Sequence, residues 1–105
     1  MGKTLGRSMI KHFIIVKWNS HVHDKKTILS DIQSIFNKLL VYKEVKSIQF
    51  FENVVDRSNR FDLMICIEME KDFLPTYDQS ESHREWKEKY GKFVENKAIF
   101  DSEAQ

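Results

Sequence analysis

The chain has 105 residues, of which 41% are hydrophobic and 31% are charged. This size and composition are typical of one folded domain, not of a disordered chain. Its 17 basic and 16 acidic residues leave a formal net charge of +1, which argues against nucleic acid and membrane surfaces as partners, because both attract a basic excess.

The organisation along the chain is simple. There is no repeat and no Pro- or Gly-rich linker, so we expect one domain over residues 9–103 behind a flexible N-terminal tail, residues 1–8. The single cysteine, Cys66, lies in an apolar run and cannot form an internal disulfide. A buried free thiol fits a reducing compartment, and we expect a cytoplasmic protein.

The first predicted element is a strand, Ile10–Trp18, because it is short, apolar and β-branched. Alternation places His12 on one face with Ile14 and Val16, and leaves Phe13 and Ile15 on the other. Both faces are apolar at their centre, so we expect both to be covered.

A helical period follows from about Asp24 to Leu40. Apolar residues recur there at helical spacing, with Lys, Asp, Gln and Asn opposite, and form one stripe: Ile28, Ile32, Ile35, Phe36 and Leu39. The pattern predicts an amphipathic helix.

Two strands are predicted next, over Val45–Val55 and Phe61–Met69, separated by the polar turn Asp56–Arg60. The second of these strands alternates, and one face carries its large apolar side chains: Phe61, Leu63, Ile65, Ile67 and Met69.

The last third of the chain predicts two helices and a strand. A short helix begins near Pro75 and ends at about Gln79. The spacing of Ser82 and Glu85 matches a capping box, which predicts that the main helix starts after Ser82. One face of that helix and its continuation carries His83, Trp86, Tyr90, Phe93 and Val94, and a short strand follows over residues 97–101.

The predicted order is β-α-β-β-α-β, the ferredoxin-like plait of an α+β domain. Two helices cover only one face of a four-stranded antiparallel sheet. A second copy of the sheet is the economical cover for the other face, so we expect a homodimer with a dimeric α+β barrel.

Several short motifs are similar, in order and spacing, to those of the stress-responsive A/B-barrel (Dabb) domain family. They are Ile10-Lys11-His12, Val45-Lys46-Ser47-Ile48, Phe61-Asp62-Leu63, Tyr77 followed by His83, and Phe100-Asp101. The resemblance runs from about Met9 to Glu103 and implies the same dimeric barrel and a stress-associated role. It also implies that Tyr77 and His83 match the tyrosine–histidine pair of a plant member that acts as a polyketide cyclase. The sequence departs from the family where an inner His-Pro is replaced by Ser80-Glu81.

These observations define a candidate site. His83, near a helix N-terminus, is the candidate general base, with Tyr77 as the donor that orients it or the substrate. His12 is a supporting pocket residue. The expected ligand-binding set is His12, Ile14, Val16, Trp86 and Tyr90.

No cofactor and no metal site are predicted. His21, His23 and Asp24 are close in sequence, but no second cluster completes a zinc site.

Three hypotheses about function stay open at this point. The first is a module that binds a small apolar or aromatic ligand between sheet and helices. The second is an acid/base enzyme that uses His83 and Tyr77 on a carbonyl compound. The third is a purely structural dimer whose pocket is filled by its own side chains.

Overall fold

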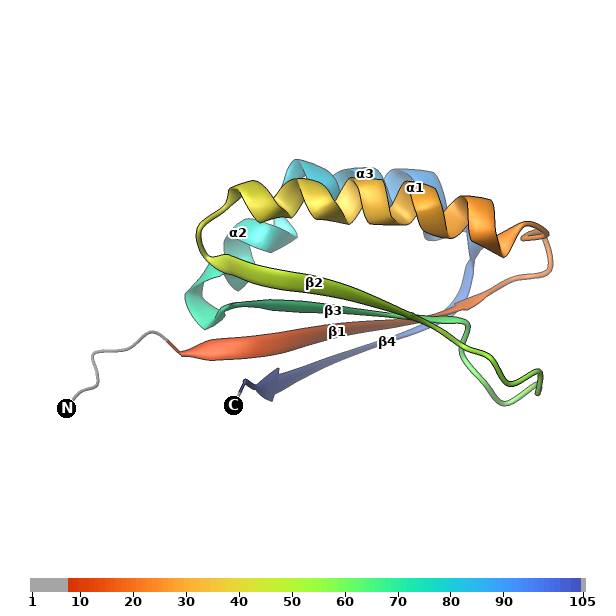
Figure 1. Ribbon diagram of the computed structural model, residues 1–105. Coiled ribbons are helices and arrows are strands. Elements are labelled where there is room, and N and C mark those ends of the chain that lie inside the picture. The colour runs from red at the N-terminus through yellow and green to blue at the C-terminus, as the bar shows by residue number, and fades with distance from the viewer. Residues whose placement is uncertain (1–7, 105) are drawn as a thin grey trace.

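The computed structural model describes residues 8–104, which form a four-stranded antiparallel sheet with its helices on one face (Figure 1). The sheet order is β2-β3-β1-β4. The elements are β1 (Met9–Trp18), α1 (Lys25–Asn37), β2 (Val45–Glu52), β3 (Leu63–Glu70), α2 (Leu74–Asp78), α3 (Glu81–Tyr90) and β4 (Val94–Glu103). The predicted α+β plait is confirmed. The predicted tail, except for Ser8, lies outside the described residues.

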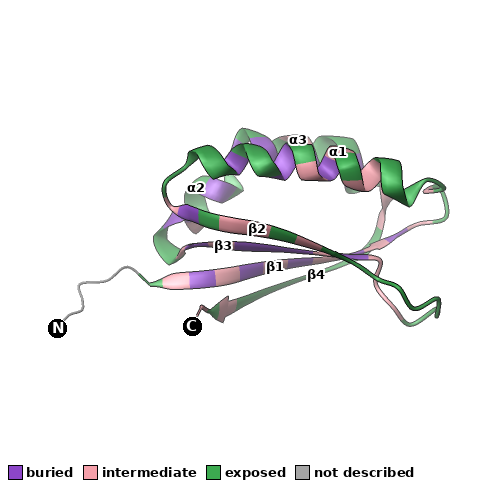
Figure 2. Cartoon of the chain, in the orientation of Figure 1, coloured by how far each residue is buried: buried purple, intermediate pink, exposed green. Residues whose placement is uncertain are grey.

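The two faces of β1 differ as the alternation predicts. Ile10, His12, Ile14, Val16 and Trp18 are buried under the helices, and the residues between them are half-buried on the outer face. Figure 2 shows β1 alternating in burial and β3 buried along most of its length. β3 is buried more completely than β1, although both are central strands with a neighbour on each side.

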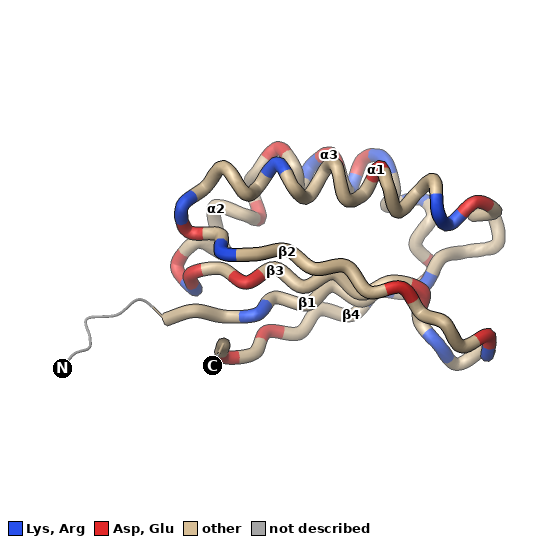
Figure 3. The backbone as a smooth tube through the Cα atoms, viewed as in Figure 1, with Lys and Arg blue, Asp and Glu red and all other residues tan. Residues whose placement is uncertain are grey.

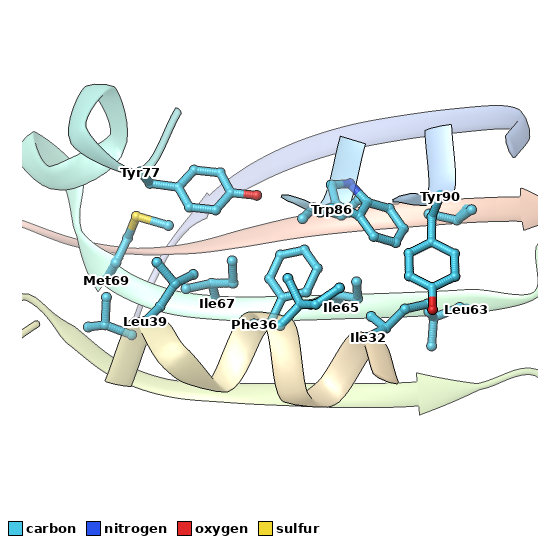
Figure 4. Close-up of a cluster of buried hydrophobic side chains, with 14 of the residues drawn as sticks. Ile32, Phe36, Leu39, Leu63, Ile65, Ile67, Met69, Tyr77, Trp86 and Tyr90 are labelled. Carbon is cyan, nitrogen blue, oxygen red and sulfur yellow. The ribbon is translucent and has the colours of Figure 1, made fainter. Parts of the chain in front are cut away.

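The core lies between the sheet and the helices (Figure 4). α1 presents Ile32, Ile35 and Phe36 to the sheet, and all three are buried. The helix begins at Lys25 because the Asp24 carboxylate accepts a hydrogen bond from the Thr27 amide at 3.1 Å. After Asn37 it tightens into a 3₁₀ turn, Lys38–Val41, so the regular helix is shorter than predicted.

The predicted start of α3 is wrong. Ser80, not Ser82, is the N-cap, and its hydroxyl accepts a hydrogen bond from the His83 amide at 3.1 Å. The helix therefore begins at Glu81, and His83 is its third residue, not its first. Ser82 is buried inside the first turn. Two serines close together made the capping motif ambiguous in the sequence.

Two strand boundaries also differ from prediction. β2 ends at Glu52, because the Asn53 side chain bonds both the amide and the carbonyl of Val55 and turns the chain away from the sheet. Val54 is consequently 92% exposed. β4 is longer than predicted, with 10 residues. It follows the edge of β1 for most of that strand's length, and the backbone ladder sustains a strand whose own sequence is mostly polar.

Charged residues of both signs are interspersed over the helices and the ends of the sheet (Figure 3). No helix in residues 8–104 is long and apolar enough to cross a membrane. The cytoplasmic location stays a prediction from the sequence.

Candidate functional site

The first component of the site is a buried histidine held by a carboxylate. The antiparallel register places His12 of β1 opposite Asp101 of β4. Nδ1 of His12 lies 2.6 Å from Oδ1 of Asp101. A neutral imidazole that donates from Nδ1 to a carboxylate keeps its Nε2 lone pair free. Asp101 thus fixes both the orientation and the tautomer of His12.

Tyr77 lies between two imidazole rings. Its ring centroid is 5.3 Å from that of His12 and 5.0 Å from that of His83, with edge-on geometry in both pairs. Pro75 lies in the first turn of the short helix α2, which carries Tyr77. The Tyr77 residue is only 1% exposed. Burial raises the pKa of the Tyr77 hydroxyl far above its usual value, with smaller contributions from Asp78 and Asp101. The hydroxyl therefore stays protonated and can donate a hydrogen bond.

The Tyr77 hydroxyl has no hydrogen-bond partner among residues 8–104. Figure 4 shows it pointing along the core toward Trp86. The indole nitrogen of Trp86, which is also buried, donates to no acceptor in the described part of the chain. The core thus holds two buried donors, the Tyr77 hydroxyl and the Trp86 indole, without a protein acceptor among residues 8–104.

His83 is half-buried at the start of α3. Desolvation lowers its pKa, Lys87 and Lys97 add to this effect, and the carboxylate and carbonyl of Asp78 oppose it. The net direction is downward, so the imidazole is neutral at neutral pH and can accept a proton. The sequence placed His83 near a helix N-terminus, but burial is the largest cause of its lowered pKa.

Trp86 and Tyr90 lie one and two turns further along α3, in an aromatic cluster with Trp18 and Phe36. The Trp86 ring is 3% exposed and packs edge-on against Phe36 at 5.4 Å. The Tyr90 hydroxyl is bonded to Asp31 of α1. The ring contacts of Trp86 are with Trp18, Phe36 and Tyr90. The polar end of Tyr90 is engaged with another helix.

Ile14 and Val16 are fully buried on the helix-facing side of β1. They continue the row that begins with His12 and form an apolar floor. Among residues 8–104, the cavity between α1 and the loop after β2, and a smaller one beside Phe51 and Met64, are not lined by His12, Tyr77, His83 or Trp86. The rings of the site are packed together in this structure, so a ligand needs side-chain rearrangement to reach them.

Sequence reasoning missed the role of Asp101. It quoted this residue only as the end of a family motif. The pairing of β4 with β1 was the signal that could have found it, because the register His12–Asp101 follows from the neighbouring pair Phe13–Phe100.

No group of three or more His, Cys, Asp or Glu side chains within residues 8–104 is arranged to hold a metal ion.

Comparison with known proteins gives structural matches alone. No protein-family model matches the chain, and a comparison with curated proteins finds no match. A dimeric ferredoxin-like protein of unknown function from Thermobifida fusca YX superposes with a TM-score of 0.78 at 15% identity, over 93% of this chain and 92% of that one. A Dabb family protein from Mesorhizobium loti MAFF303099 superposes with a TM-score of 0.70 at 17% identity, over 94% and 99%.

An enzyme is among the similar structures. The hydroxynitrile lyase of Passiflora edulis superposes with a TM-score of 0.73 at 12% identity, over 95% of this chain and 96% of that one. At such identities the likeness establishes the fold. This chain has the ferredoxin-like fold of a Dabb family protein, as the sequence resemblance implied.

Proposed function

We propose that this protein binds a small, mainly apolar ligand through one acceptor oxygen, held between the sheet and the helices by Tyr77, Trp86 and His83. The observation that carries the proposal is the buried hydroxyl of Tyr77, which is without a hydrogen-bond partner in the described part of the chain.

The energetic argument concerns that unpaired group. A buried hydroxyl without a partner costs about 1–3 kcal/mol of stability, and buried polar groups in native proteins are nearly always paired. A ligand oxygen that reaches the Tyr77 hydroxyl would accept from it, and the Trp86 indole, toward which that hydroxyl points (Figure 4), is the candidate second donor. The competing explanation is an ordered water at the same place.

The ligand class follows from the surrounding side chains. Both Tyr77 and the Trp86 indole would donate, so the ligand must supply an acceptor such as a ketone or phenol oxygen. The floor of Ile14 and Val16 and the neighbouring rings are apolar, which favours an aliphatic or aromatic body.

Tryptophan fluorescence tests this proposal. In a Trp18→Phe variant, Trp86 reports alone, and we expect aryl ketones and phenols to change its emission saturably at micromolar concentration. Adding Tyr77→Phe removes one donor and should weaken binding about tenfold. If no compound changes the emission, or if Tyr77→Phe leaves the affinity unchanged, the proposal fails.

An acid/base enzyme is the second candidate, and the packing of the Tyr77 ring against the His83 ring, with 5.0 Å between centroids, favours it. Tyr77 would donate to a substrate carbonyl oxygen while neutral His83 takes a proton from the adjacent carbon. The C–H electron pair then moves into an enolate, which can be reprotonated elsewhere or close a ring. The fold is compatible with an enzyme, since one similar structure is a lyase.

Loss of deuterium from the α-carbon of a bound β-keto compound tests the enzyme. We expect exchange catalysed by the wild-type protein, and its loss in His83→Ala while binding persists. Exchange at the same rate in His83→Ala would exclude His83 as the base.

The proposal includes a homodimer formed through the outer face of the sheet. That face carries Phe13, Ile15, Phe51, Met64 and Phe100. Phe51 and Phe100 are 46% and 59% exposed. The similar structure from Thermobifida fusca is described as dimeric, and a second sheet would bury this apolar face.

A further inference from the structure

A cavity of about 700 Å³ lies at the other end of the core from Tyr77. It lies between the start of α1 and the loop that joins β2 to β3, residues 53–62. Its volume is within the 300–1,000 Å³ range of small-molecule sites. None of the residues in the proposed site lines it.

The floor of the cavity is apolar. Trp18 contributes from the end of β1, Ile32 from α1 and Leu63 from the start of β3, and all three are buried. Leu29 and Val22 extend this surface toward the loop before α1. An aromatic ring or short alkyl chain would find apolar contacts there.

The rim is rich in hydrogen-bond donors. Four cationic side chains (Lys17, Lys25, Arg57 and Arg60) and three carboxylates (Glu52, Asp56 and Asp62) line the cavity. One carboxylate is already engaged: Asp62 accepts from Lys25 Nζ at 2.9 Å and from the Trp18 amide at 2.7 Å. Glu52, at the end of β2, and Asp56, on the loop, are both exposed. The lining therefore carries one net positive charge.

Several N–H groups of these side chains have no acceptor among residues 8–104. Lys17 Nζ donates to the carbonyls of Ser58 and Arg60, at 3.1 and 3.0 Å, which leaves one of its three N–H groups. Arg60 uses one donor on Asn59 at 2.8 Å. The Arg57 side chain has no ion pair or hydrogen bond within residues 8–104. Such a set suits an anion with several acceptor oxygens.

We propose that this cavity is a second binding site, separate from the Tyr77 site, for a small amphipathic anion: an aromatic or aliphatic carboxylate. The body of the ligand lies on Trp18 and Leu63, and the carboxylate accepts from Lys17 and the two arginines. The floor residues Trp18 and Leu63 lie on the helix-facing side of the sheet, opposite the outer face of the proposed dimer.

Paired probes test the charge requirement. We would titrate the protein with 2-naphthoate and with 2-naphthamide, which share a ring system and differ in charge, and record amide and indole NMR signals. Naphthoate should shift the Trp18 indole signal and the amides of residues 53–62, and should bind about tenfold more tightly than naphthamide. The indole signal that disappears in a Trp18→Phe variant belongs to Trp18, and the remaining one belongs to Trp86.

Arginine variants test the rim. Arg57→Gln with Arg60→Gln should weaken naphthoate binding about tenfold, whereas Arg84→Gln should not, because Arg84 lies on α3 outside the cavity. The amide spectrum verifies that each variant is folded.

Three results would overturn the inference: equal binding of naphthamide, undiminished binding by the arginine variant, or no shift at the loop with either probe. Shifts confined to α2 and α3 would overturn the second site and support the Tyr77 site. Shifts confined to the loop would support the second site and argue against binding of these probes at Tyr77. The two proposals therefore fail independently.

Discussion

The Tyr77 hydroxyl is the residue on which the proposed function depends, and its removal has an unusual expected effect. Tyr77→Phe deletes a buried donor that has no partner among residues 8–104. We expect the free energy of unfolding to stay the same or to rise by up to about 1 kcal/mol. Urea denaturation measures this. A loss of more than about 2 kcal/mol would mean that water or protein already satisfies the hydroxyl.

The His12–Asp101 pair gives a second prediction at the same scale. Asp101→Asn replaces an acceptor by an amide that can also donate, so the proton is no longer fixed on Nδ1 of His12. The ¹⁵N signals of the imidazole should change from the Nδ1–H tautomer toward a mixture. Unchanged signals would mean that another contact sets the tautomer.

Part of the site was predictable from the residues alone. Strand alternation placed His12 on the helix-facing side, and family resemblance selected Tyr77 and His83. Asp101 escaped because its role depends on strand register, a long-range property. The cavity beside Trp18 could not be predicted from the sequence for the same reason, because its walls come from four separate segments.

At the scale of elements, the start of α3 depends on Ser80. Ser80→Ala removes the hydroxyl that accepts from the His83 amide and should cost about 1 kcal/mol of unfolding free energy. Ser82→Ala is the matched control, because the Ser82 hydroxyl caps nothing and should cost much less. Chemical denaturation measures the unfolding free energy of both variants and shows which serine caps the helix. A larger loss of unfolding free energy in Ser82→Ala than in Ser80→Ala would mean that Ser82 is the N-cap, as the sequence predicted.

The contact between α1 and α3 predicts a pH dependence. The Tyr90 hydroxyl bonds the Asp31 carboxylate and is the main cause of that group's lowered pKa, with Lys89 contributing at 3.4 Å. A carboxyl whose folded pKa lies below its unfolded value of 3.8 stabilises the fold above that pH, and the contribution is lost as pH falls through the folded pKa.

Tyr90→Phe should therefore reduce the loss of stability between about pH 5 and about pH 2.5. Urea unfolding at several pH values in this window measures the slope. An unchanged slope would mean that Asp31 is not held by Tyr90 in solution.

Helical and strand periods were enough to predict the order of the elements, because each element buries one continuous face. They failed at boundaries set by other contacts. The Asn53 side chain ends β2 through bonds to Val55, and β4 is extended by pairing with β1, although little in its own sequence alternates.

For the whole molecule, the exposed outer face of the sheet predicts association. Phe100→Lys introduces a charge into that face and should convert the dimer to a monomer. Val41→Lys is the control, because Val41 is 83% exposed but lies beyond α1, away from that face. Sedimentation equilibrium distinguishes the states. A monomeric wild-type protein at micromolar concentration, or a dimeric Phe100→Lys variant, would contradict the dimer.

The fold class was predictable because a β-α-β-β-α-β order has few compact arrangements. The function was not, because it depends on side chains that separate segments bring together around Tyr77, and no local pattern in the chain specifies that arrangement.

A crystal structure of the protein with the tightest-binding ketone or phenol tests the central claim most directly. The quantity to measure is the identity of the atom within hydrogen-bond distance of the Tyr77 hydroxyl oxygen. We predict a ligand oxygen there that also accepts from the Trp86 indole. An ordered water at that place, with the compound elsewhere or absent, would contradict the account.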